Sequence, residues 1–285
     1  MKLPVYEASK RWVGIDVWRG LVVVTALIIH MTQIKPEPDL IAWGDFFSGY
    51  ASIGVVFGGI AGMMGYGAYG RQPFKLRDCI RREWRRAGIL IITYLIYYLV
   101  LQELGLSGGQ WLSIYCVLAG VYLVAPLYWW LTAKVNRSYA SGLIVIMMMT
   151  TARLLMETAK LPGLIRNLGF DYWLNTTPLL PVIAVYGTGA LIMELKQRGR
   201  LTRPMINLAW GVIALYAPGR YWLNSLDIYP NQQFVIRLSL MALLAVGFVG
   251  LKPKHWPKGL LALAYLGQQS FWVFTVGNLL LALWL

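Results

Sequence analysis

The sequence predicts an all-α fold: a polytopic helical membrane protein with about nine transmembrane helices. Hydrophobic residues make up 58% of the 285 residues, and the mean hydropathy is +0.56. Only 13% of the residues are charged, whereas soluble domains average about a quarter. Apolar runs near the length that crosses a bilayer recur along the chain. Together these three observations exclude an ordinary water-soluble domain.

No hydrophilic stretch is long enough to fold alone, so residues 1–285 are expected to form a single membrane-embedded domain. The formal net charge of +14 would suggest nucleic-acid binding in a soluble chain. Here no polar domain exists to present these charges, and Lys and Arg gather in cytoplasmic loops of membrane proteins. We therefore expect no nucleic-acid partner. The two cysteines, Cys79 and Cys116, fall in different kinds of segment and imply no disulfide framework and no metal site.

Flanking prolines, glycines and charged residues set the boundaries of the apolar runs. The predicted helices cover residues 17–34, 45–70, 87–103, 111–133, 139–158, 177–195, 205–217, 233–251 and 259–285. We expect a basic loop over residues 71–86 and a re-entrant or lid-like segment over 159–176. The helix over 205–217 is short, and its Ala-Pro218-Gly219 end leaves open whether it spans the membrane fully or dips into it.

Loop charge predicts the orientation of these helices. When the N-terminus is placed in the cytoplasm, the inner loops hold most of the Lys and Arg residues. The outer loops then hold only Lys35, Lys160, Arg166 and Arg220. This bias is the one described by the positive-inside rule, so we expect an N-in, C-out topology.

The first predicted helix and the residues just before it carry an acid, a guanidinium and an imidazole among apolar residues. Arg19 and His30 are eleven residues apart, which places them on one face about 16 Å apart along the axis. Asp16 precedes Arg19 by three residues and joins the same side. The small residues Val23 and Ala26 lie between them. We expect Arg19 and His30 to face a common tunnel, in which His30 suits the work of a general base.

Each of these residues also has a structural interpretation. An arginine near a helix end can extend to the membrane interface, and a histidine can hydrogen-bond between helices. The alignment of Asp16, Arg19 and His30 favours the functional interpretation, because intramembrane ionisable groups are costly to retain.

Four arginines, Arg81, Arg82, Arg85 and Arg86, close the predicted basic loop. They can hold the phosphates of an acyl-CoA or anionic lipid headgroups, or they can reflect the positive-inside rule alone.

Three further polar residues are candidates for substrate binding. Arg153 and Glu157 are four apart in the predicted helix 139–158, so they face one another. They can form a structural ion pair, bind a polar substrate or orient His30, and Arg237 can serve either purpose. Asn278 and the Gln268-Gln269-Ser270 group can form hydrogen bonds between helices.

At these residues the sequence resembles the transmembrane acyltransferase superfamily. That group includes the type 3 acyltransferases, the glucan-succinylating membrane enzymes and the heparan-glucosaminide N-acetyltransferase relatives. The resemblance rests on Ile15-Asp16-Val-Trp-Arg19-Gly20, with ten residues between Arg19 and His30. The glycine-rich second segment, Pro178-Leu-Leu-Pro181, and Leu266-Gly267-Gln-Gln-Ser270-Phe-Trp-Val-Phe274 extend it over nearly the whole chain.

The resemblance implies transfer of an acyl group from cytoplasmic acyl-CoA, either acetyl-CoA or succinyl-CoA, to a carbohydrate hydroxyl or amine at the outer face. The enzyme would lie in the inner (plasma) membrane and use no metal. Asp16, Arg19 and His30 would form the catalytic group, with His30 as the base and Arg19 on the acyl-donor path. Membrane lipids and the carbohydrate acceptor would be its partners.

A different class of function stays open: a non-catalytic, degenerate membrane subunit that packs with other subunits in a larger complex. Small-residue helix faces and 13 tryptophans suit that role as well. A transporter is disfavoured, because the sequence has no internal symmetry.

Overall fold

The computed structural model describes residues 12–34, 38, 53–70, 74–105, 113–134, 179–224, 230–251 and 257–284. Over these residues the chain forms nine α-helices and no strand, which confirms the predicted all-α class. The helices are α1 (Val13–Ile34), α3 (Ile53–Tyr69), α4 (Leu76–Glu103), α5 (Ser113–Lys134), α9 (Leu179–Gln197), α10 (Arg203–Asn224), α11 (Pro230–Gly250), α12 (Lys258–Gln268) and α13 (Ser270–Leu283).

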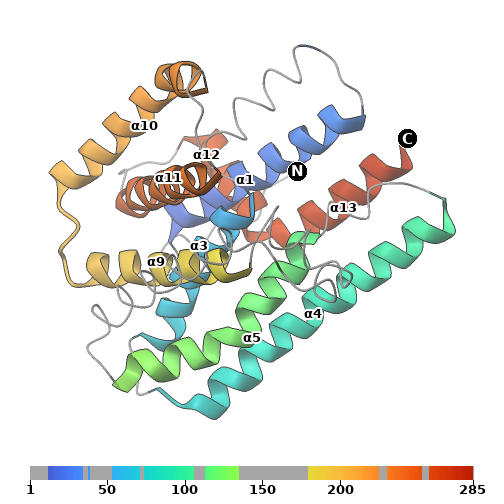
Figure 1. Cartoon of the computed structure of the whole chain (residues 1–285), viewed down its shortest axis with the longest axis horizontal. Helices are drawn as coiled ribbons and strands as arrows, with labels where there is room; N and C mark the ends of the chain where they lie inside the picture. Colours follow the sequence, from blue (N-terminus) through green and yellow to red (C-terminus); the bar gives the residue numbers. More distant parts are fainter. Residues whose placement is uncertain are drawn as a thin grey trace.

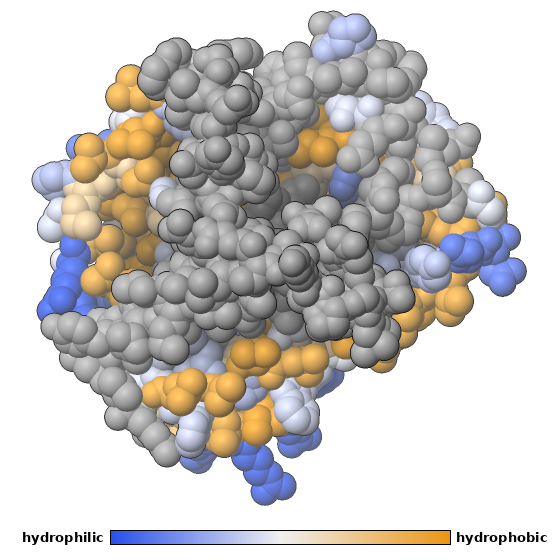
Figure 2. Space-filling view, in the orientation of Figure 1, coloured by the Kyte–Doolittle hydropathy of each residue, from blue (hydrophilic) through white to orange (hydrophobic). Residues whose placement is uncertain are grey.

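Three of the described helices are long and apolar enough to cross a membrane: Val13–Thr32 of α1, Leu76–Glu103, and Ile114–Ala133 of α5. Figure 2 shows hydrophobic residues over much of the described surface on one face, with hydrophilic residues gathered toward its edges. Helix α4 exposes a run of large apolar side chains, Ile89, Ile92, Leu95, Ile96 and Leu99. Apolar surface of this extent marks a face that meets lipid or another protein.

Helix α1 begins at Val13, four residues before the predicted start. Asp16 therefore lies in the first turn of the helix, where the helix dipole favours an acidic side chain. The apolar residues Val13, Ile15 and Val17 are buried there, so packing extends the helix toward the N-terminus.

The predicted basic loop over residues 71–86 is wrong for most of its length. Helix α4 begins at Leu76 and runs without interruption to Glu103. Its buried residues include Cys79, Glu83, Ala87 and Leu90, and this helical spacing continues through the charged stretch. Arg, Glu and Leu are good helix formers, so the drop in hydropathy marks a change in environment and not the end of the helix.

Two other predicted elements are corrected. The segment predicted as a short helix over 205–217 is α10, a continuous helix of 22 residues that includes Pro218. The predicted last helix is instead two helices, α12 and α13, which meet at Gln269. The predicted helix over 139–158 and the lid-like segment over 159–176 lie outside the described residues.

The first helix of the chain packs closely against the last two helices. Helix α1 packs on α12 and α13, while α4 and α5 lie side by side along one edge of the molecule (Figure 1). A Cβ atom at Gly20 would meet the carbonyl oxygen of Leu263, and one at Gly267 would meet that of Asp16. The backbones of α1 and α12 therefore touch, as small residues permit in membrane helix pairs.

The Gly267→Ala variant is expected to lower the stability of the protein by about 1–3 kcal/mol, because the added methyl group must separate α1 from α12. The thermal unfolding midpoint of the protein in lipid nanodiscs measures this effect. Gly211→Ala is the matched control: it lies within a helix with no atom within 4 Å of the added Cβ. The Gly211→Ala variant should have an unchanged or slightly higher unfolding midpoint. Equal midpoints for the two variants would contradict the close packing.

Candidate functional site

Arg19 is held between its own helix and α13. Its Nη2 donates to the Ser270 hydroxyl at 2.6 Å, and its Nη1 lies 3.5 Å from Asp16 Oδ1. Asp16 is buried, and both partners of this pair are largely shielded from solvent. The predicted association of Asp16 with Arg19 is therefore present as an ion pair one turn apart on α1.

His30 is buried on the same helix and also bonds to α13. Its Nδ1 lies 2.5 Å from Asn278 Oδ1, and the Asn278 amide donates from Nδ2 to the Phe274 carbonyl at 2.7 Å. Since the amide nitrogen is committed to Phe274, the amide oxygen faces His30 and accepts a hydrogen bond from Nδ1–H. Neutral His30 is thus held in the tautomer whose basic nitrogen is Nε2.

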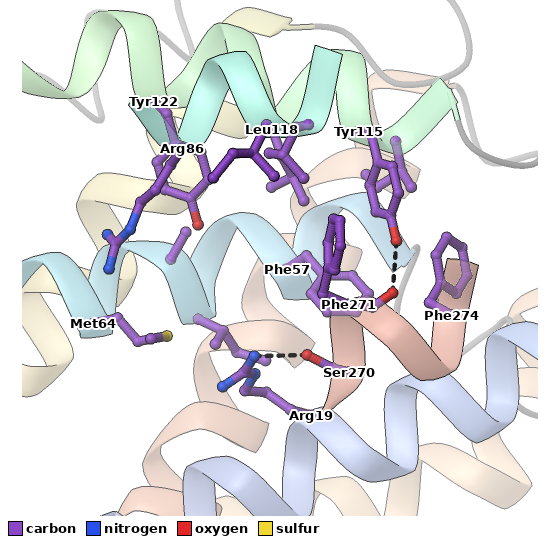
Figure 3. Close-up of a pocket in the computed structure, with 15 residues that line it drawn as sticks. Arg19, Phe57, Met64, Arg86, Tyr115, Leu118, Tyr122, Ser270, Phe271 and Phe274 are labelled. Carbon is purple, nitrogen blue, oxygen red and sulfur yellow. Dashed lines mark hydrogen bonds between the residues drawn. The ribbon is translucent and has the colours of Figure 1, made fainter. Parts of the chain in front are cut away.

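A cavity of about 220 Å³ lies beside this helix pair, between α1, α3, α4, α5 and α13 (Figure 3). Most of its lining side chains are apolar or aromatic, and the charged ones are two arginines. The lining residues are Arg19, Phe57, Ile60, Ala61, Met64, Arg86, Ile89, Leu90, Ile114, Tyr115, Leu118, Tyr122, Ser270, Phe271 and Phe274.

The polar and aromatic groups occupy different parts of this cavity. Figure 3 shows Arg86 and Arg19 reaching in from opposite walls, with the Ser270 hydroxyl beside Arg19. The rings of Phe271, Phe274 and Tyr115 gather at the other end. Tyr115 stacks on Phe271 with centroids 5.5 Å apart, and its hydroxyl donates to the Phe271 carbonyl at 3.1 Å. One cavity therefore offers both guanidinium groups and an apolar chamber.

Arg86 is held by a carboxylate that is fully buried. Its Nη1 donates to both oxygens of Glu83, at 3.0 and 3.2 Å. The Tyr69 hydroxyl donates to the same carboxylate at 2.6 Å, which links α3 to α4. The guanidinium also lies over the Tyr122 ring, 5.7 Å from its centroid. These partners orient Arg86 toward the cavity, where Glu83 itself is not a lining residue.

The structure separates the four arginines that were predicted to act with Arg19. Arg86 follows the buried Glu83 by three residues and lines the cavity with Arg19. Arg81, Arg82 and Arg85 are exposed on α4, with Arg82 lying 5.7 Å from the centroid of the Tyr69 ring. These three side chains do not reach the described cavity.

This cavity is not the predicted common tunnel that both Arg19 and His30 would face. Arg19 lines it, whereas His30 does not and bonds to a different partner on α13. The Phe274 ring lines the cavity, and its centroid is 5.8 Å from that of His30. Val23 and Ala26, which were expected to leave a gap between Arg19 and His30, are fully buried, so this face of α1 is packed and forms no open path.

The side chains of the remaining predicted site residues lie outside the part of the chain that the structure describes. Arg153 and Glu157 belong to a segment that the structure does not describe. Arg237 lies within α11, but its side chain is not among those described. Within the described ranges, no group of three or more His, Cys, Asp or Glu residues is placed to hold a metal ion.

Sequence reasoning missed Glu83 and Phe274 as members of the site. Glu83 had a detectable signal, because it is an isolated acid among arginines and precedes Arg86 by three residues. Phe274 had no such signal, since an aromatic residue in an apolar helix is ordinary core. The predicted role of Ser270 and Asn278 in hydrogen bonds between helices is confirmed, because both form such bonds to α1.

In comparisons with protein-family models, curated proteins and solved structures, no match to this chain is found.

We expect the hydrogen bond from His30 to Asn278 to fix the tautomer of the imidazole. In protein labelled with ¹⁵N-histidine, the spectrum at neutral pH should show His30 protonated at Nδ1. Asn278→Leu removes the acceptor and should give a mixture of tautomers, whereas Asn278→Asp should keep Nδ1 protonated. His255→Asn removes the only other histidine signal. An unchanged spectrum in Asn278→Leu would show that Asn278 does not orient the ring.

Glu83→Gln is expected to destabilise the protein by about 1.5–3 kcal/mol, because it removes the counter-charge and weakens the charged hydrogen bonds of the partly buried Arg86 guanidinium. The unfolding midpoint in nanodiscs measures this loss. Asp78→Asn is the matched control, since it removes a carboxylate from an exposed position on the same helix. Equal stability for both variants would show that the buried ion pair does not matter to folding.

Proposed function

We propose that this chain is an integral membrane acyltransferase. It moves an acyl group from cytoplasmic acyl-CoA to a hydroxyl or amine of a carbohydrate at the outer face of the inner membrane, with an N-in, C-out arrangement of about nine spans. One observation carries the proposal. An apolar cavity has two guanidinium groups at one end, and Phe274, which lines its other end, lies beside a buried histidine bonded to Asn278.

The donor enters at the arginine end. The exposed Arg81, Arg82 and Arg85 lie on the same helix as Arg86, before it in the sequence, and form a basic approach to the cavity. Guanidinium groups bind phosphate strongly through paired hydrogen bonds, so this surface suits the phosphates of coenzyme A. Arg86 and Arg19 then hold the polar end of the donor where the cavity begins.

The acceptor is activated at the His30 end. Nε2 of His30 removes the proton from the attacking hydroxyl or amine as its oxygen or nitrogen bonds to the thioester carbonyl carbon. The carbon–sulfur bond then breaks, the electron pair leaves with the coenzyme A sulfur, and the proton on His30 neutralises the thiolate. The Asn278 amide oxygen accepts the hydrogen bond from Nδ1–H, which makes Nε2 the basic nitrogen of the neutral ring. The Phe274 ring must move for the donor to reach His30.

A non-catalytic membrane subunit is the second candidate, and one observation favours it. His30 is buried between Asn278 and Phe274 and does not line the cavity, which is also what a purely structural histidine would show. The exposed apolar face of α4 would then contact other subunits of a complex.

His30→Ala is expected to lower acyl transfer by about 10²- to 10⁴-fold without loss of folding, because it removes the general base. Release of coenzyme A thiol from acyl-CoA in the presence of carbohydrate acceptors measures the activity. His255→Ala is the control that removes the other histidine, and it should retain full activity. Size-exclusion profiles and unfolding midpoints establish that both variants fold.

Full activity in His30→Ala would remove His30 from the mechanism. A purified wild-type protein that binds no acyl-CoA, but co-isolates in fixed ratio with other membrane proteins, would favour the non-catalytic subunit.

A further inference from the structure

The charged side chains that line the cavity, among the described residues, are both cations. Arg19 and Arg86 line it, whereas their partners Asp16 and Glu83 do not. Each ion pair is neutral as a whole, but its positive end is the one that faces the cavity. Both oxygens of Glu83 accept from Nη1 of Arg86, and a guanidinium has five N–H donors in all. The cavity is therefore suited to a ligand that carries an anionic group.

The rest of the lining offers few polar groups to such a ligand. The Tyr115 hydroxyl is already bonded to the Phe271 carbonyl and to Thr275, and the Ser270 hydroxyl accepts from Arg19. A glycerophosphate head carries several oxygens, and those that met the apolar walls would lack hydrogen-bond partners, which is unfavourable. A carboxylate has only two oxygens, and guanidinium groups bind it in pairs of hydrogen bonds. The site therefore favours a carboxylate head over a larger one.

The exposed side of α4 places the mouth of this cavity in the membrane. Trp84 is 53% exposed, and from residue 89 to residue 96 every exposed side chain of this helix is Ile or Leu. Tryptophan is enriched at the membrane–water interface, so Trp84 marks the depth at which α4 enters the hydrocarbon. Arg86 lies about 3 Å and Ile89 about 7.5 Å farther along the helix axis. Ile89 and Met64 are the most exposed lining residues, so the cavity opens toward lipid just below the interface.

We infer that the cavity binds a free fatty acid from the bilayer. Its carboxylate lies between Arg19 and Arg86, which reach in from opposite walls (Figure 3). Its alkyl chain lies on the apolar and aromatic walls, and any part that exceeds the cavity passes between Met64 and Ile89 into the lipid. A charged group is costly in hydrocarbon, so a fatty acid already holds its carboxylate near the depth of Arg86.

This ligand is additional to the proposed acyl donor, and its binding does not depend on acyl transfer. Both molecules would contact Arg19 and Arg86. A bound fatty acid would therefore occupy the path of the donor and inhibit the proposed reaction.

Binding of radiolabelled palmitate to the full-length protein in phosphatidylcholine nanodiscs tests this inference, and empty nanodiscs correct for partition into lipid. Hexadecanol, which has the same chain length and no charge, is the deciding comparison. In a bilayer both chains are already in apolar surroundings, so a preference for palmitate must come from its head. We expect palmitate to bind at least about tenfold more tightly than hexadecanol, because charged hydrogen bonds hold the carboxylate. Acetate, which has the head without the chain, should not displace palmitate.

Matched variants on α4 test the head and the mouth separately. Arg86→Lys keeps a cation near Glu83 but removes the guanidinium, so palmitate should bind about tenfold more weakly while hexadecanol binding is unchanged. Arg77→Lys, at an exposed position that does not line the cavity, is its control. Ile89→Trp adds bulk at the mouth and should weaken the binding of both ligands, whereas Ile92→Trp, also exposed but outside the lining, should weaken neither. A general loss of folding cannot lower palmitate binding alone.

The outcomes separate this inference from the proposed function. Equal affinity for palmitate and hexadecanol, or palmitate binding that Arg86→Lys leaves unchanged, overturns the fatty-acid site even when acyl transfer is measured. Nanodiscs that contain phosphatidylglycerol distinguish the source of the anion: if this lipid displaces palmitate, the ligand is a phospholipid headgroup and the fatty-acid assignment is overturned. Palmitate that binds as expected to a protein that binds no acyl-CoA supports the site, and then the transferase proposal fails alone.

Discussion

Polar groups buried along an apolar helix must find their partners on a neighbouring helix, and this requirement organises the site. Helix α1 places Arg19 and His30 about 16 Å apart along its axis. Helix α13 supplies Ser270 to the first and Asn278 to the second. An unpaired guanidinium or imidazole in this environment would be strongly unfavourable, so the register between α1 and α13 is set by both bonds at once. The touching backbones at Gly20 and Gly267 join α1 to α12, the helix that directly precedes α13 in the chain.

Each of the two arginines that line the cavity is likewise paired with a buried polar partner. Arg19 is paired with Asp16 and Arg86 with Glu83, so each cation has its counter-charge outside the cavity. The protein therefore retains two guanidinium groups at the edge of an apolar space without burying unpaired charge. Such pairs add little to stability by themselves, because desolvation offsets the attraction. The two ion pairs instead fix the positions of the guanidinium groups, which can then donate hydrogen bonds to the oxygens of a ligand with a polar head.

The sequence predicted what depends on local pattern and missed what depends on distant contacts. The all-α class and the pairing of Asp16 with Arg19 were predictable, because hydropathy and helical spacing are visible within one segment. The start of α4 was missed, since a charged stretch of good helix formers looks like a loop when only hydropathy is considered. The partners of Arg19 and His30 lie some 250 positions away, so a single sequence indicates only that Ser270 and Asn278 are polar. The position of Phe274 follows from packing alone.

Phe274 connects the two halves of the site. Its backbone carbonyl accepts the hydrogen bond that orients Asn278, its ring lies beside His30, and the residue also lines the cavity. A ligand that fills the cavity therefore presses on the same residue that holds the histidine and its amide partner. Close-packed interiors transmit such displacements instead of absorbing them. In a catalytic protein, a donor that enters the cavity would displace this ring and so reach His30, whereas a structural protein would keep the ring fixed. The two candidate functions thus differ in the motion of one side chain.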